Sequence, residues 1–176
     1  MRIVNGHIAG SGILPPQALP DPTPGLSVFL GRNEAGKSTC LDFFRAMLAG
    51  YPDGRSREGK QRSGAPLNGG AGGGSLLLET GLAGRVRLTR KPGGNGGQLS
   101  LADAEGAPLD AMLAERLFAG VTREVYRNVY GFSLDELQSF QSLNAEGVRN
   151  ALYGASFGMG VRPPGEALKQ LDGQLA

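Results

Sequence analysis

The feature that most constrains this chain is the glycine-rich string GRNEAGKST at residues 31–39. It matches the phosphate-loop pattern G-x-x-x-x-G-K-[ST]. The apolar run Leu26–Leu30 before it predicts a short buried strand. Residues 40–51 after it predict a helix, because apolar residues recur at helical spacing. Strand, loop and helix form the context that this motif requires, so the segment predicts a site for a nucleoside triphosphate.

The residue types in the loop suit a compact anion. Gly31 allows a sharp turn and Gly36 allows the backbone to approach phosphates, whose charges backbone N–H groups can bind. Lys37 is expected to act as the catalytic cation near the β- and γ-phosphates, and the Ser38 hydroxyl as a ligand of Mg²⁺. We expect Glu34 to point outward. The residues expected to line the nucleotide are Gly31, Asn33, Glu34, Ala35, Gly36, Lys37, Ser38 and Thr39.

Composition excludes several classes of protein. The chain has 176 residues, a net charge of +2 and a single cysteine, Cys40, so no disulfide framework is expected and the length suits one domain. No run of 18 apolar residues predicts a membrane span, and residues 1–7 lack a signal-peptide core, which predicts a cytoplasmic protein without a membrane partner. The one histidine, His7, falls in a strand-like run, and no His/Cys cluster suggests a metal.

Periodicity and turn residues predict an α/β fold with a mixed sheet, the phosphate-loop helix packed on it and an antiparallel meander at one side. A first strand is expected at residues 2–9 and a second near Ile13-Leu14. The meander should comprise residues 75–80, 85–90 and 98–102, and the later helices residues 109–118, 122–130, 133–143, 144–153 and 163–176.

Residues 52–74 predict an exposed, mobile loop, because they are rich in glycine and carry four basic residues: Arg55, Arg57, Lys60 and Arg62. One interpretation of this cluster is a solvated loop. The other is a contact with a DNA backbone or a nucleotide.

A hydrolytic phosphate-loop enzyme also needs a second acidic motif, called Walker B, in which an acid follows a buried apolar strand. The nearest candidate is the segment 129–136, which ends in Asp135-Glu136, but Gly131 and Ser133 interrupt its apolar run. A capping box that begins at Ser133 explains both acids without catalysis. Residues 103–106 fit D-x-x-G but suit a turn better, and Asn-Lys-x-Asp is absent, so a guanine switch protein is not favoured.

These strings resemble the YhaN-like ATPases, relatives of the SMC-like, ATP-binding-cassette class. The resemblance rests on the phosphate-loop string with residues 41–50, on residues 127–138 and on residues 151–156. It implies an AAA-type or SMC-like N-terminal ATPase head lobe at residues 1–162 and the start of a coiled-coil helix at residues 163–176.

The resemblance further implies that ATP and Mg²⁺ bind between heads. A C-terminal lobe of the same protein or a second head would complete the site with Walker B and signature motifs. It also implies DNA repair or chromosome maintenance, with DNA as a partner. Relatives place a glutamine near residues 131–138. Ser133 stands about where that glutamine is expected, and Gln138 is the candidate further along.

Two rival functions remain open. A small phosphate-loop kinase would use residues 52–74 as an arginine-bearing lid. A binding or assembly module without turnover would present apolar faces to a missing lobe. Phosphate transfer to an acceptor would favour the first, and concentration-dependent self-association without hydrolysis the second.

Overall fold

The computed structural model describes residues 1–52, 65–118, 121, 123–134 and 136. The chain divides into two compact units, Met1–Ala119 and Gly120–Ala176.

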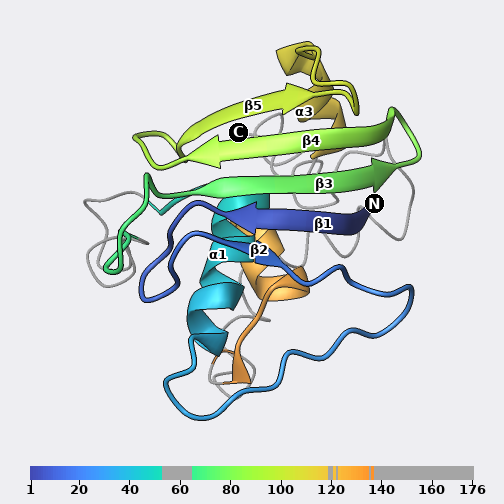
Figure 1. Ribbon diagram of the computed structural model, residues 1–176. Coiled ribbons are helices and arrows are strands. Elements are labelled where there is room, and N and C mark those ends of the chain that lie inside the picture. The colour runs from blue at the N-terminus through green and yellow to red at the C-terminus, as the bar shows by residue number, and fades with distance from the viewer. Residues whose placement is uncertain (53–64, 119–120, 122, 135, 137–176) are drawn as a thin grey trace, which may run out of the picture. The chain divides into compact units, whose positions relative to one another are not determined.

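A five-stranded sheet forms the body of the first unit (Figure 1). Its strands lie in the order β2-β1-β3-β4-β5 and all four pairings are antiparallel. The strand bounds are Arg2–Ile8 (β1), Gln17–Leu19 (β2), Gly74–Thr80 (β3), Gly84–Lys91 (β4) and Gln98–Ala102 (β5). The predicted meander is confirmed almost to the residue, because glycine-rich turns separate three runs of strand-forming residues.

The register gives the sheet one apolar and one polar face, since side chains alternate along each strand. Leu76 and Leu78 of β3 lie beside Leu88 and Val86 of β4, and all four are fully buried. The opposite face carries the intervening residues of the same strands. Most of the core of the first unit therefore lies on one side of the sheet, although Leu77 is buried on the other side.

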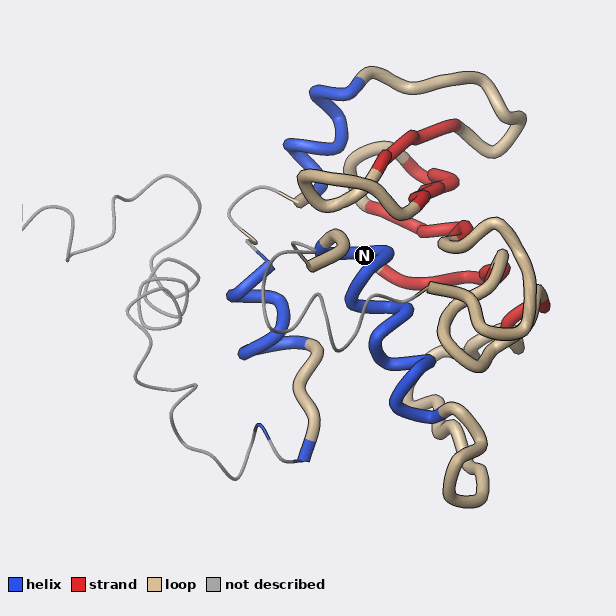
Figure 2. The backbone as a smooth tube through the Cα atoms, turned by 90° about the vertical axis from the view of Figure 1, so that its left-hand side faces the viewer, coloured by secondary structure: helices blue, strands red, loops and turns tan. Residues whose placement is uncertain are grey.

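Helix α1 (Lys37–Ala49) contributes Phe43 and Met47 to that core, and both are buried. A side chain at Gly74 would overlap the Phe43 ring and the His7 carbonyl, so α1 and β1 can approach β3 only at a glycine. Figure 2 shows α1 beside the sheet in a second view.

The C-terminal end of α1 is held by Arg90, a buried residue of β4 that sequence analysis did not single out. Its Nε donates to the Met47 carbonyl at 3.0 Å and its Nη1 to the Gly96 carbonyl at 3.0 Å. Burial lowers the pKa of Arg90 and raises that of nearby Tyr51. Because a helix leaves its last carbonyls unpaired, this guanidinium satisfies a group that would otherwise be buried alone.

The structure corrects the expected strand at Leu26–Leu30. These residues pair with no strand in the part of the chain that is described, and Leu26 and Leu30 are 87% and 89% exposed. Figure 1 shows the connection from β2 to α1 as a long loop outside the sheet. Apolar runs of this length indicate a strand only when a neighbouring strand pairs with them.

Two further expectations about the sheet also need correction. The sheet is antiparallel throughout its described pairings, not mixed, because the expected phosphate-loop strand does not join it. The second strand lies at Gln17–Leu19, whereas Ser11 and Leu14 form an isolated bridge around a tight turn.

Helix α3 (Ala111–Leu117) confirms the helix expected at residues 109–118. Asp110 caps it, because its Oδ1 accepts from the Met112 N–H at 2.9 Å. Asp103 Oδ1 accepts from the Glu105 and Ala107 N–H groups, so residues 103–106 form a turn after β5, as expected, and not a switch motif.

The second unit is described only in its first part. Helix α4 (Arg123–Val125) continues into a π-helix, η1 (Tyr126–Tyr130), in place of the single helix expected at residues 122–130. Helices expected beyond residue 136, the coiled-coil start at residues 163–176, the basic residues of 55–62 and Gln138 lie outside the described residues.

Candidate functional site

The phosphate loop connects an extended segment to the first turn of α1 and lies at the surface. Lys37 is the first residue of that helix, and its ammonium donates to the carbonyls of Gly31 at 2.8 Å and Arg32 at 2.7 Å. The lysine therefore bridges the beginning and end of its own loop. These are exposed hydrogen bonds between a cation and neutral carbonyls, which an anion can replace at little cost.

Two glycines give the loop its shape. Gly36 has φ +88°, a conformation that disfavours other residues, and a Cβ there would meet Leu14 Cδ2 at 2.7 Å. At Gly31 a Cβ would lie 3.0 Å from that of Ala35, so the loop closes tightly on itself. Glycine is therefore favoured at position 36 by its backbone conformation, and a Cβ at position 31 would need Ala35 to shift slightly.

The N-terminus of α1 presents backbone donors. The Cys40 N–H bonds to the Gly36 carbonyl at 2.8 Å. Within the described residues, no acceptor is found for the amides of Gly36, Lys37, Ser38 and Thr39. Such a helix end attracts anions through its N–H groups and its dipole. No acidic residue lies in the first turn of α1 to oppose this attraction.

The other residues predicted to line the nucleotide are mostly exposed, but they differ in how well they suit phosphate binding. Asn33, Glu34, Ala35 and Ser38 are exposed and Thr39 is half-buried. Glu34 has φ +67°, which is unusual for a residue other than glycine. No ion pair between Glu34 and Arg32 is found among the described residues. An ion pair with Arg32 therefore does not reduce the repulsion between the Glu34 carboxylate and a phosphate.

Sequence analysis missed a turn that braces the loop. Residues 11–14 form a turn closed by two hydrogen bonds between Ser11 and Leu14. The Leu14 side chain lies next to Gly36, where an added Cβ would be 2.7 Å from Leu14 Cδ2. An added Cβ at Gly12 would lie 2.8 Å from the Thr39 methyl group. The glycine spacing Gly10-Ser11-Gly12 was the signal available in the sequence, since a close backbone approach favours glycine.

Cys40, one turn into α1, is half-buried, and this burial raises the pKa of its thiol. The thiol is therefore partly removed from solvent and ionises less readily than an exposed thiol would.

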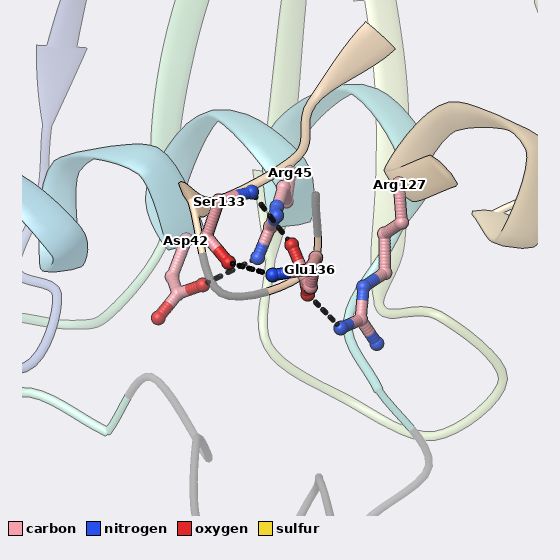
Figure 3. A network of polar contacts seen from close by, with 5 residues as sticks. All are labelled: Asp42, Arg45, Arg127, Ser133 and Glu136. Atoms are coloured by element: carbon pink, nitrogen blue, oxygen red, sulfur yellow. Dashed lines mark hydrogen bonds and ion pairs between the residues drawn. The ribbon is translucent and has the colours of Figure 1, made fainter. Parts of the chain in front are cut away.

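The candidate Walker B segment takes a different structure. Residues 126–130 form the π-helix, and a capping box follows in which the Ser133 N–H donates to Glu136 Oε2 at 2.7 Å and the Glu136 N–H to Ser133 Oγ at 3.3 Å. Arg127 also binds Glu136 at 2.6 Å (Figure 3). Glu136 is therefore engaged in local structure, as the capping-box interpretation predicts.

Figure 3 also shows an ion pair within α1, between Arg45 and Asp42 at 3.4 Å. Arg45 is only 3% exposed, and the sequence pattern did not predict its burial. The pair links residues three apart on one helix face, so it helps to hold the helix that carries Lys37.

No group of three or more metal-binding side chains occurs among the described residues.

Comparisons with known proteins give two matches. The sequence model of a family described as AAA domain matches residues 6–174. The chain is 28% identical over 176 residues to the "Uncharacterized protein YhaN" of Bacillus subtilis (strain 168). The alignment covers 99% of this chain and 17% of that protein, so the chain spans about a sixth of the length of its relative. Among the described helices, none has the length and apolar character to cross a membrane.

Proposed function

Because the chain belongs to the AAA domain family and is YhaN-like, we propose that it binds ATP with Mg²⁺ through residues 31–39, as one lobe of a larger ATPase. The observation that carries this proposal is the exposed Lys37 ammonium, held on two loop carbonyls beside the open amides of α1. A cation and a row of N–H donors at one helix end are what a triphosphate requires.

The residues fit the group in space as well as in charge. Gly36 has φ +88°, which few other residues adopt, and a Cβ at Gly31 would come within 3.0 Å of Ala35 Cβ in the same loop. The backbone amides of residues 36–39 would donate hydrogen bonds to phosphate oxygens. The Lys37 ammonium would leave the Gly31 and Arg32 carbonyls and bind phosphate oxygens instead. The Ser38 hydroxyl is the protein ligand for Mg²⁺, which when bound neutralises charge on the phosphates.

The lobe is proposed to be incomplete without a second one, either a C-terminal lobe of the same protein or another head. The exposed apolar segment Leu26–Leu30 supports this, because soluble domains seldom expose neighbouring large apolar residues without a partner. The helical structure of residues 126–130 supports it too, since no buried strand precedes Glu136 to form a Walker B motif. Work in DNA repair or chromosome maintenance is proposed from the family resemblance.

Titration with a fluorescent ATP analogue and Mg²⁺ tests the binding site. Replacement Lys37→Ala should weaken binding at least about tenfold, because a charge-assisted hydrogen bond contributes roughly 1.5–3 kcal/mol. Arg116→Ala, which removes an exposed cation on α3, is the control and should bind as wild type does. Equal affinity of wild type and Lys37→Ala would refute the assignment.

A phosphate-release assay tests the half-site. The purified 176-residue chain should bind nucleotide and release phosphate very slowly, since residues that activate water would come from the second lobe. Rapid turnover by the chain alone would contradict the proposal. Self-association that grows with concentration and is unaffected by ATP would favour the assembly module instead.

A further inference from the structure

The polar face of the sheet carries a row of cations that the fold does not use. Arg85, Arg87 and Lys91 all lie on β4, are exposed, and point to the face opposite the buried Val86 and Leu88. We call these three residues the basic strand face. In the described part of the chain, no side-chain hydrogen bond or ion pair is found for any of the three, although Arg85 is close enough to Glu79 to help lower its pKa.

The neighbouring strands do not neutralise this charge. By register, Glu79 of β3 lies opposite Arg85, and it is the one acidic residue on this face of the described strands. Glu79 already binds Arg2 of β1, with Nη2 and Oε2 2.6 Å apart, and the hydrogen bond from Arg2 lowers its pKa. Glu79 thus interacts with both Arg2 and Arg85, and four cations (Arg2, Arg85, Arg87 and Lys91) against one acid leave a net charge of +3 on this face.

Such an arrangement is unfavourable for the sheet itself. Arg85 and Arg87 project from the same face about 7 Å apart, and like charges at that spacing repel. Stability alone would favour alternating signs. The unbalanced row therefore indicates an anionic partner outside the first unit.

The spacing and chemistry favour a nucleic-acid backbone over an acidic protein. From Arg85 to Lys91 the strand extends about 20 Å, which equals the rise of about six nucleotides along the axis of a DNA duplex. Guanidinium groups match phosphate geometry, and the neighbours Thr89 and Ser100 offer hydroxyl donors of the kind that contact phosphates. No strand of the sheet contains Phe, Tyr or Trp, so there is no platform on which unpaired bases could stack.

We propose that the basic strand face binds the phosphate backbone of duplex nucleic acid without reading its sequence. The inference rests on the DNA-associated role proposed above and gives that role a surface. It replaces the basic residues of 55–62 as the first surface to test, since those lie outside the described residues.

Fluorescence anisotropy with labelled DNA duplexes of about 20 base pairs tests the proposal. The double variant Arg85→Gln/Arg87→Gln should bind the duplex at least about tenfold more weakly at low salt. The slope of log K against log salt concentration should become shallower by about two units. The control Arg116→Gln removes an exposed cation on α3 and should match wild type. Wild-type affinity and slope in the double variant would overturn the proposal.

Two further measurements separate charge from packing and DNA from protein. Arg87 lies opposite the buried Leu77 and could cover it, so Arg85→Lys/Arg87→Lys is compared with the glutamine pair. The lysine variant should keep the wild-type salt slope, and a loss equal to that of the glutamine variant would overturn the proposal. The proposal would also be overturned if polyglutamate of equal total charge displaced the duplex. A preference for one duplex sequence over another would contradict it too.

ATP binding provides the remaining control. The glutamine double variant should bind the ATP analogue as wild type does, and Lys37→Ala should retain DNA binding. Failure of the basic strand face with intact nucleotide binding would refute only this inference. If Lys37→Ala kept both ATP-analogue binding and DNA binding, only the proposed nucleotide site would be refuted.

Discussion

At Glu34 the phosphate loop contains a carboxylate and a left-handed backbone in the same residue. Only one other non-glycine residue in the described chain, Asn95, has positive φ. Asparagine adopts this conformation with less strain than glutamate does. Local strain of this kind concentrates at functional loops, because the surrounding structure holds it in place.

Replacement of Glu34 should therefore separate strain from charge. We expect Glu34→Asn to raise the free energy of unfolding by about 0.5 kcal/mol relative to Glu34→Gln, since both remove the charge but only asparagine suits the backbone. Urea unfolding measures the difference. A more stable glutamine variant would show that φ at this position does not carry the strain.

Cys40 supplies a pH-dependent probe beside the loop, because it is the single cysteine of the chain. Burial raises the pKa of its thiol above the ordinary value, and only the thiolate reacts with iodoacetamide. Alkylation of the folded protein should therefore be slower at pH 8 than that of the urea-unfolded chain, as measured by mass spectrometry. The raised pKa stabilises the fold below the ordinary thiol pKa, and that contribution is lost as pH rises through the folded value. Equal alkylation rates would place the thiol in solvent.

At the scale of elements, α1 is held at both ends by other elements of the first unit. The turn at residues 11–14 packs against Gly36 at its start, and Arg90 binds the Met47 carbonyl at its end. Between them Phe43 lies against Gly74 of β3. The position of the phosphate loop therefore depends on contacts that are distant in sequence.

Two glycines allow this dependence to be tested. Gly74→Ala should destabilise the protein by about 2–3 kcal/mol, because the added methyl group overlaps the His7 carbonyl and the Phe43 ring. Gly81→Ala is the matched control, since a Cβ there meets nothing within 4 Å and its φ is not positive. It should leave stability unchanged or raise it slightly. Thermal unfolding compares the two, and an equal effect of both variants would argue against close packing at Gly74.

At the scale of the whole molecule, the first unit buries its apolar strands and exposes the apolar segment that precedes the phosphate loop. Leu78 is fully buried, whereas Leu26 and Leu30 lie almost wholly in solvent. Hydrophobic burial stabilises a fold only where surface is removed from water. This segment is therefore available to a partner and contributes little to the stability of the lobe.

Substitution at these sites should separate the two roles. Leu26→Ser/Leu30→Ser should change the free energy of unfolding by less than about 0.5 kcal/mol, whereas Leu78→Ala should lower it by about 3 kcal/mol. Urea titration gives both values. Strong destabilisation by the serine pair would mean that the segment is buried in solution, as its sequence alone suggested.

The sequence by itself determined the local features of this protein. Glycine turns and alternating apolar residues located β3, β4 and β5, because strand formation there follows from residue order. The capping box at Ser133 and the turn at Asp103 were predictable for the same reason, since both bond to backbone a few residues away. The string at residues 31–39 predicts a phosphate loop from its glycines and lysine, and this assignment stays a prediction.

Only the tertiary structure decided which segments meet. An apolar run such as Leu26–Leu30 carries no information about whether a neighbouring strand exists, so its exposure could not be foreseen. The buried Arg90 reads in sequence as one more basic residue of β4, and only the packing of α1 distinguishes it from the exposed Arg87. Pairings between distant segments depend on the three-dimensional register of the sheet, which residue order alone does not specify.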